Sequence, residues 1–299
     1  MAMPEAPTAD RDAVFIEVAI NEAVSRDQHR HVPVTAEECA TDAIASVGAG
    51  ASFAHWHAPD LGAYTAAWRA MRAAGVIAYP TYPSRPPLDV DARLGHCFEL
   101  VEQDDLEMVP LDLGTAHQIM WDGNRLVGGG TLANPLPFLT AAAQRYRTTR
   151  AIINLASFDL GHTRLAVRLA RVGVLAPPLL LKIYLSDTWL VGPEPSTAAL
   201  DLHLAQLPAD LEIHWLVVPF RLHERATFDT LCRHALERGG GFRVGIGDNP
   251  SLFPHSRNAD LVEMVQPWVT ASDRRVATTD DVRRLLCRAD AHDDPAGGA

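Results

Sequence analysis

Lysine is nearly absent from this sequence of 299 residues, in which Lys182 is the single lysine among 26 basic residues. The 37 acidic residues outnumber the basic ones and give a net charge of −11. Such an acidic surface repels the phosphates of nucleic acids and anionic lipids, so we expect neither nucleic acid nor a membrane as a partner. The lone lysine has to be considered individually, because a buried lysine can act as a nucleophile.

Cysteine is scarce as well, and long apolar runs are missing. The four cysteines show no Cys-x-x-Cys spacing, which argues against a disulfide framework and against a zinc ribbon. The most apolar run, residues 174–185, is broken by two prolines and Lys182 and is much shorter than the ~20 residues of a membrane span. Residues 1–12 lack the apolar core of a signal peptide, so we predict a disordered lead-in and a cytoplasmic protein.

Apolar, β-branched runs alternate with amphipathic stretches along the rest of the chain, which indicates alternating strands and helices. The first helix is marked by a capping-box pattern from Thr35 to Glu38 and by glycine at its end. Strands are expected at residues 14–20, 51–57, 76–79, 107–111, 151–155, 179–185, 212–217 and 242–246. Helices are expected at residues 35–48, 62–74, 89–103, 135–147, 158–172, 196–207, 224–238 and 258–269.

Eight strand–helix units over ~250 residues, without a Gly-x-Gly-x-x-Gly after the first strand, favour a closed barrel over an open sheet. We therefore predict an α/β fold, a TIM (β/α)8 barrel in a single domain of residues 13–290, with an extra short helix at 280–288. The polar, glycine-rich residues 291–299 are predicted to be a disordered tail. Gly128–Gly130 follows the fourth strand, where we expect a flexible active-site loop.

Two histidines one residue apart, His55 and His57, stand at the end of the second strand. Side chains alternate along a strand, so both imidazoles point to the same side. They can supply two of the three protein ligands of an open catalytic metal site. The carboxyl ends of barrel strands carry the active site in this fold, which is where this pair falls.

Polar residues also follow the other strands and form a predicted rim. They are Asn21, Glu22, Thr81, Asp112, Asn154, Tyr184, Asp187, Arg221, Asp248 and Asn249. On the eighth strand, Arg243 shares a face with Gly245 and Gly247. An arginine inside a barrel has to be paired, and we expect Asp248 as one partner and a substrate carboxylate as another. A purely structural ion pair is the alternative.

Several motifs in the same order resemble the β-keto acid cleavage enzyme family over almost the whole chain. They are residues 19–21 (Ala-Ile-Asn), 32–38, 48–51, 55–57 (His-Trp-His), 158–162, 239–245 and 248–249 (Asp-Asn). The resemblance implies a TIM barrel that assembles as a homo-oligomer, a dimer or tetramer. It also implies Zn²⁺ as the cofactor and acetyl-CoA and a small β-keto acid as substrates, with acetoacetate and a new acyl-CoA as products.

By the same resemblance, His55 and His57 would hold the zinc, while Arg243 and Asp248 would be catalytic and support the base step. We expect Asn21, Thr81 and Asp112 from the rim to bind the substrate. The chain departs from the family at the third metal ligand, a glutamate on the eighth strand whose place is taken by Gly247.

Strands eight and one are neighbours in a closed barrel, so a carboxylate from the first strand can reach the same point. We predict Glu22 as the third ligand, with Gly247 leaving room for it. Strict alternation would not let Asn21 and Glu22 both point inward, but a loop that begins at Asn21 removes this objection.

Three other functions remain open on the sequence alone. A metal-dependent hydrolase of the amidohydrolase type also uses His-x-His, but it needs further histidines where this chain has Asn154 and Tyr184. Lys182, inside the sixth strand, could form a Schiff base with a carbonyl substrate. The loss of the glutamate at position 247 also allows a non-catalytic descendant that binds a small carboxylate.

Overall fold

The structure is a computed structural model that describes residues 12–83 and 88–286. The predicted tail at 291–299 and all but Asp12 of the predicted lead-in at 1–12 lie outside the described residues. No helix among those described is both long enough and apolar enough to cross a bilayer.

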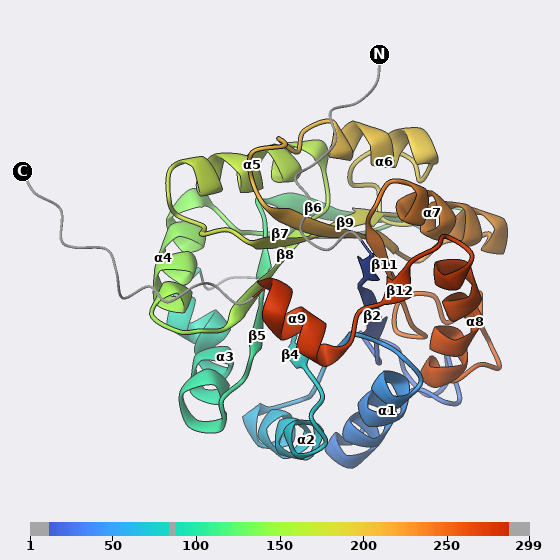
Figure 1. Cartoon of the computed structure of the whole chain (residues 1–299), viewed down its shortest axis with the longest axis horizontal. Helices are drawn as coiled ribbons and strands as arrows, with labels where there is room; N and C mark the ends of the chain where they lie inside the picture. The colour runs from blue at the N-terminus through green and yellow to red at the C-terminus, as the bar shows by residue number, and fades with distance from the viewer. Residues whose placement is uncertain (1–11, 84–87, 287–299) are drawn as a thin grey trace, which may run out of the picture.

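Eight parallel strands form the centre of the molecule, in the hydrogen-bonded order β4-β3-β2-β11-β10-β9-β8-β5. Their bounds are β2 Ile16–Ala19, β3 Phe53–Trp56, β4 Ala78–Pro80, β5 Met108–Asp112, β8 Ile152–Ser157, β9 Leu179–Leu185, β10 Ile213–Pro219 and β11 Gly241–Val244. The first and last strands of this order, β4 and β5, also contact each other, which brings the sheet round into a barrel (Figure 1). The predicted TIM-barrel fold is confirmed.

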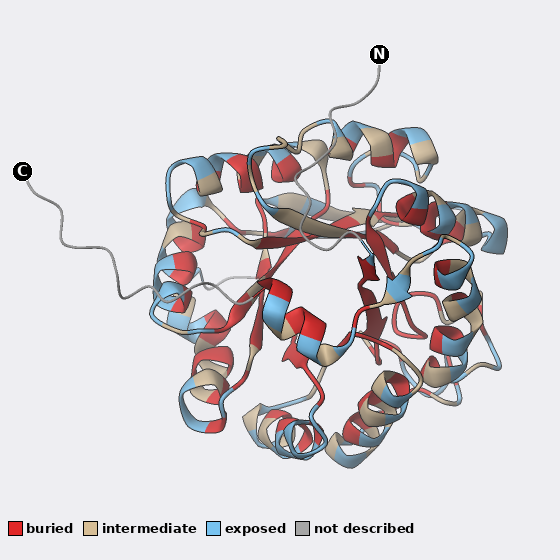
Figure 2. Ribbon diagram, in the orientation of Figure 1, coloured by how far each residue is buried: buried red, intermediate tan, exposed pale blue. Residues whose placement is uncertain are grey.

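Helices surround this barrel on the outside (Figure 1). They are α1 Ala36–Gly48, α2 Leu61–Ala73, α3 Val90–Asp104, α4 Leu136–Arg147, α5 Leu160–Arg171, α6 Thr197–Leu204, α7 Arg225–Glu237 and α8 Asn258–Thr270. The predicted capping box of the first helix is present: Glu38 N–H donates to the Thr35 hydroxyl at 3.2 Å, and the Glu38 carboxylate accepts from Thr35 N–H at 3.0 Å. Each helix turns its buried face toward the strands (Figure 2).

The core has two parts because each strand buries both of its faces. One part lies between the strands and the helices and includes the large side chains of Trp56, Trp68 and Phe228. The other fills the amino-terminal half of the barrel interior with early strand residues such as Phe53, Met108 and Leu180.

Helix α9, Thr279–Leu286, covers the amino-terminal end of the barrel and adds Val282 and Leu286 to the interior core. It crosses in front of the barrel opening in Figure 1. A short parallel pair, β1 Ala13–Val14 with β12 Arg275–Val276, ties the chain that leads into α9 to the first strand. The carboxyl ends of the strands therefore remain as the end at which polar chemistry can take place.

The prediction of a loop at Gly128–Gly130 is wrong. These glycines lie in β7, Leu126–Leu132, which pairs antiparallel with β6, Ala116–Trp121. The sequence pattern did not indicate this strand because glycine has a low propensity for strands. The register of this pairing shifts between Gln118 and Ile119, where Gly128 has a φ of +94°. A Cβ at position 128 would lie only 2.3 Å from the Gln118 carbonyl oxygen, so glycine is needed there.

Candidate metal centre and active site

His55 lies in β3 and His57 directly follows this strand, and their Nε2 atoms are 3.2 Å apart. The Nδ1 atom of His55 lies 3.1 Å from the carbonyl oxygen of Tyr79, to which it donates, so its Nε2 lone pair is free for a ligand. Burial lowers the pKa of His55 to about 4. A neutral imidazole is the form that binds metals, so the environment keeps this side chain ready to act as a ligand.

Glu22 completes a cluster of three donors. Its two carboxylate oxygens lie 3.1 Å from His55 Nε2 and 2.9 Å from His57 Nε2, and all three ligand atoms fall within 4.8 Å of one another. Burial by itself would raise the pKa of Glu22, but His57, Arg243 and His55 together hold it well below its usual value. The carboxylate is therefore ionised beside the two imidazoles.

The backbone explains how Glu22 reaches inward. Strand β2 ends at Ala19, so Asn21 and Glu22 lie beyond the regular strand, and Glu22 takes the left-handed φ of +41°. Gly247 lies directly beside it: a Cβ added there would be 3.0 Å from Glu22 Cγ and 3.0 Å from the Ala19 carbonyl oxygen. A side chain at position 247 would thus compete with Glu22 for the same space.

Arg243, on β11, has a fully buried guanidinium with carboxylates on several sides. Asp248 binds it in a bidentate manner, at 2.7 Å from Nε and 2.5 Å from one terminal nitrogen, as expected from the sequence. Two further carboxylates contact the same guanidinium, since Glu17 accepts from Nη1 at 3.1 Å and Glu22 accepts from Nη2. Tyr184 is also within hydrogen-bonding distance, at 3.1 Å.

Below the metal cluster lies a buried group that was missed in the sequence: Glu17, Tyr79 and Lys182. Lys182 Nζ donates to the Tyr79 hydroxyl at 2.5 Å, and that hydroxyl donates to Glu17. The Tyr79 ring also stacks on His55, with centroids 4.5 Å apart. Burial lowers the pKa of Lys182, and only 3% of the residue is exposed. Tyr79 thus separates Lys182 from the histidines, which places the lysine under the site and not in its mouth.

The buried charges nearly balance. Glu17, Glu22 and Asp248 carry three negative charges, and Arg243 and Lys182 carry two positive ones, which leaves one net negative charge. A divalent cation at the cluster would change this to one net positive charge. Burial raises the pKa of Asp248 to about 6 even though Arg243 lowers it, so this carboxylate can exchange a proton near neutral pH.

The three residues predicted to bind substrate lie on the same rim. The Asn21 side chain holds the backbone of His57, with Oδ1 accepting from His57 N–H at 2.8 Å and Nδ2 donating to His57 C=O at 3.0 Å. Thr81 follows β4, and its carbonyl oxygen lies 2.7 Å from His96 Nε2. Asp112 ends β5, is half-buried, and has a pKa raised by burial.

An aromatic wall, formed by Phe158, Tyr184, Trp189 and Phe220, borders this rim and was not foreseen. Its rings pack at centroid distances between 4.6 and 6.3 Å. Trp189 Nε1 donates to the His117 carbonyl oxygen at 2.9 Å, which ties the wall to the β6–β7 hairpin. Tyr184 joins the wall to the ion network, since it contacts both Phe158 and Arg243.

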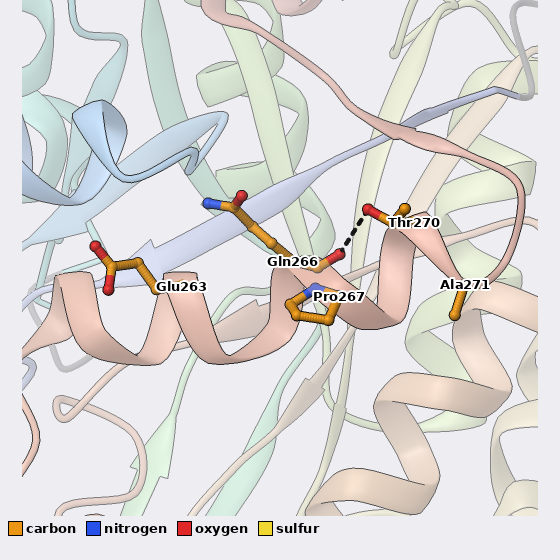
Figure 3. A pocket seen from close by; sticks show the side chains of 5 residues that line it. All are labelled: Glu263, Gln266, Pro267, Thr270 and Ala271. Carbon is orange, nitrogen blue, oxygen red and sulfur yellow. Dashed lines mark hydrogen bonds between the residues drawn. The ribbon is translucent and has the colours of Figure 1, made fainter.

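A hollow elsewhere on the surface is not connected to this centre. It lies on α8 and is lined by Glu263, Gln266, Pro267, Thr270 and Ala271 (Figure 3). The Thr270 hydroxyl donates to the backbone oxygen of Gln266 within the same helix, as in any exposed helical turn. This open surface gathers no set of donors comparable with the cluster at the barrel mouth.

Comparison with known proteins gives one consistent picture. A family model described as "beta-keto acid cleavage enzyme" matches residues 13–287. A 3-dehydrocarnitine:acetyl-CoA trimethylamine transferase from Rhizobium meliloti (strain 1021) is 24% identical over 315 residues, which cover 94% of this chain and 98% of the relative.

Among solved structures, apo ObcA superposes with a TM-score of 0.64 at 17% identity over 86% of this chain. The chain spans 65% of that ObcA chain. A ternary complex of ObcA with a C4-CoA adduct and oxalate gives the same TM-score at 18% identity, covering 86% of this chain and 67% of that one. A truncated 3-deoxy-D-arabino-heptulosonate 7-phosphate synthase from Thermotoga maritima reaches 0.52 at 12% identity, covering 89% and 90% of the two chains. At these identities the likeness concerns the fold.

Proposed function

Because the chain belongs to the beta-keto acid cleavage enzyme family, we propose that it is a zinc-dependent acyltransferase acting on a β-keto acid and acetyl-CoA. In this reaction the bond between C2 and C3 of the keto acid breaks. The two-carbon fragment with the carboxylate joins the acetyl carbon of acetyl-CoA, whose bond to the CoA sulfur breaks, to give acetoacetate. The remaining acyl group joins the CoA sulfur that is released. All atoms are retained, so no water, oxidant or reductant is needed.

The observation that carries the proposal is the cluster of Glu22, His55 and His57. Two imidazole nitrogens and one carboxylate oxygen are a typical ligand set of catalytic zinc, which leaves a coordination position for substrate. The hydrogen bond from His55 Nδ1 to the backbone of Tyr79 gives the orienting contact that zinc-binding histidines usually have. Bound Zn²⁺ would act as a Lewis acid that polarises the keto carbonyl.

The protein groups around the cluster have separate tasks in this proposal. Asp248 is the general base, since its buried carboxylate has a pKa raised to about 6. Arg243 holds Asp248 in place through both oxygens and prevents it from turning toward solvent. Asn21 positions His57 through two backbone hydrogen bonds. In this proposal Thr81 and Asp112, at the ends of β4 and β5, contact the substrate.

Acetyl-CoA as the second substrate rests on the relatives. The Rhizobium meliloti transferase is named for acetyl-CoA, and the ObcA fold has been solved with a C4-CoA adduct. The identity of the keto acid does not follow from these names, because the sequence identities are 24% and 18%. We also propose a homo-oligomer, dimer or tetramer, in line with the family resemblance.

The experiment is a turnover assay with and without metal. Protein stripped by a chelator and then reloaded with Zn²⁺ is incubated with acetyl-CoA and a panel of β-keto acids, and acetoacetate is measured. We expect activity in the reloaded protein alone. Asp248→Asn should retain zinc and lose activity by at least ~100-fold, as expected for removal of a general base. Equal activity in stripped and reloaded protein would contradict the proposal.

A further inference from the structure

Arg221 stands at the mouth of the barrel and has no task in the chemistry proposed above. It directly follows β10, and its φ of +48° lies in the left-handed region, which is costly for a residue with a side chain. Its N–H donates to the Asp248 carbonyl oxygen at 3.2 Å, and its own carbonyl oxygen accepts from the Thr188 hydroxyl at 2.6 Å. A large cationic side chain on a backbone conformation that favours glycine indicates that the arginine is kept for a functional reason.

Arg221 is half-buried, and its guanidinium lies over the ring of Phe220, 5.4 Å from the ring centroid. Within residues 12–83 and 88–286, no carboxylate pairs with it. Arg243 differs, because three carboxylates bind it. Arg221 therefore presents an uncompensated positive charge to the mouth.

A substrate anion needs such a charge. The three buried carboxylates and two buried cations of the site carry one net negative charge, and a divalent metal would leave one net positive charge. The carboxylate of half-buried Asp112 at the same rim offsets this one remaining positive charge. Arg243 cannot supply the contact either, because Asp248, Glu17 and Glu22 already accept from its nitrogens.

We propose that Arg221 binds a carboxylate of the keto acid, a step that deepens the proposed function and rests on it for the nature of the ligand. A planar guanidinium offers paired N–H donors that match a carboxylate. The Phe220 ring lies against this guanidinium and packs on the Tyr184 ring at a centroid distance of 5.6 Å, so the carbon chain of the substrate can pack on an aromatic surface. Arg221 lies over the Phe220 ring and Arg243 over the Tyr184 ring, which favours a substrate with a neutral, apolar carbon chain over one with a cationic group.

Substitutions that suit the backbone separate binding from folding. Glycine and asparagine both accept a positive φ, so Arg221→Gly and Arg221→Asn should melt no lower than the parent. We expect the KM for the keto acid to rise about 10- to 100-fold, the factor expected for loss of one charge-assisted contact. The KM for acetyl-CoA should stay the same, and Arg221→Lys should recover part of the loss. Arg225→Gln, which removes a nearby charge already paired with Asp229, is the matched control and should not change either KM.

A binding measurement keeps this test independent of turnover. Acetoacetate, which is itself a β-keto acid, is titrated calorimetrically into zinc-loaded parent and zinc-loaded Arg221→Gly, and we expect binding about 10-fold weaker in the variant. If the parent binds acetoacetate through Arg221 but never turns over, the proposed function fails and this inference stands. The inference is overturned if the parent does not bind acetoacetate or if the variant binds it equally well. A rise confined to the KM for acetyl-CoA, or a lower melting temperature in both variants, would overturn it too.

Discussion

Exchanging the carboxylate between positions 22 and 247 tests how the proposed metal centre is built. In Glu22→Gly one of three ligands is lost, and we expect zinc affinity to fall by more than the ~10- to 100-fold typical of losing a supporting contact. The fold should tolerate this change. Glycine at φ +41° relieves a left-handed cost of ~1–2 kcal/mol and adds a chain-entropy cost of ~0.5–1 kcal/mol, so the two backbone effects nearly cancel. Arg243 loses Glu22 as a partner but keeps Asp248 and Glu17.

Adding Gly247→Glu to Glu22→Gly should restore much of the zinc affinity. The close contact between position 247 and Glu22 Cγ disappears in this background. The Ala19 carbonyl oxygen and the Asn21 carbonyl carbon, each 3.0 Å from the new Cβ, must shift by a few tenths of an ångström. In the parent background, Gly247→Glu should instead be destabilising by ~1–3 kcal/mol, because the two side chains overlap.

Affinities are measured by competition with a chromogenic zinc chelator, and stabilities by urea unfolding of the metal-free proteins. Asp105→Gly is the matched control, since Asp105 also has a left-handed φ, +51°, at the exposed end of α3. This control should bind zinc as the parent does. Parent-like zinc affinity in Glu22→Gly, or no recovery in the double variant, would refute the hypothesis that Glu22 supplies the ligand in place of a residue at position 247.

Two further predictions concern groups outside the metal cluster. Glu17→Leu removes the carboxylate that lies 4.0 Å from Lys182 Nζ and one of the three carboxylates bound to Arg243, and it should reduce the free energy of unfolding by ~3–5 kcal/mol in urea titrations, whereas a loss below ~1 kcal/mol would mean that water or other groups replace it. His203 is fully buried with Nδ1 on the Thr163 hydroxyl, and burial lowers its pKa to about 4. Because the unfolded chain takes up this proton below the ordinary pKa of ~6.5 and the folded chain does not, stability should fall by up to ~1.4 kcal/mol per pH unit between about 6.5 and 4. His203→Asn should flatten that slope, and an unchanged slope would show that His203 is not the group responsible.

Much of the fold could be predicted because its signals are local. The alternation of apolar runs, the capping box at Thr35 and the glycines after helices each depend on neighbours in sequence, and they placed the eight strands and the surrounding helices close to where they are. The hairpin β6–β7 escaped because Gly128–Gly130 pairs through a bulge, for which sequence periodicity provides no sign.

Some residues of the candidate site could likewise be predicted from the sequence, and others could not. The spacing of His55 and His57, at the end of a barrel strand, indicated two possible ligands. Glu22 was predicted from the family resemblance, in which Gly247 replaces a glutamate, together with the adjacency of the first and last strands in a closed barrel. The group of Glu17, Tyr79 and Lys182 depends on three strands far apart in sequence, whose register no short motif encodes. The available signal was weak but present: a glutamate and a lysine stand inside otherwise apolar strands, where an unpaired charge is costly.

Isotope transfer during turnover tests the proposed carbon–carbon exchange most directly. A β-keto acid labelled with ¹³C at C1 and C2 is incubated with unlabelled acetyl-CoA and the zinc-loaded protein, and the products are analysed by mass spectrometry. The proposal predicts that both labels appear together in acetoacetate while the rest of the keto acid appears, unlabelled, as a new acyl-CoA. Labelled acetate with no new acyl-CoA would show hydrolysis of the keto acid and would contradict the acyltransferase function.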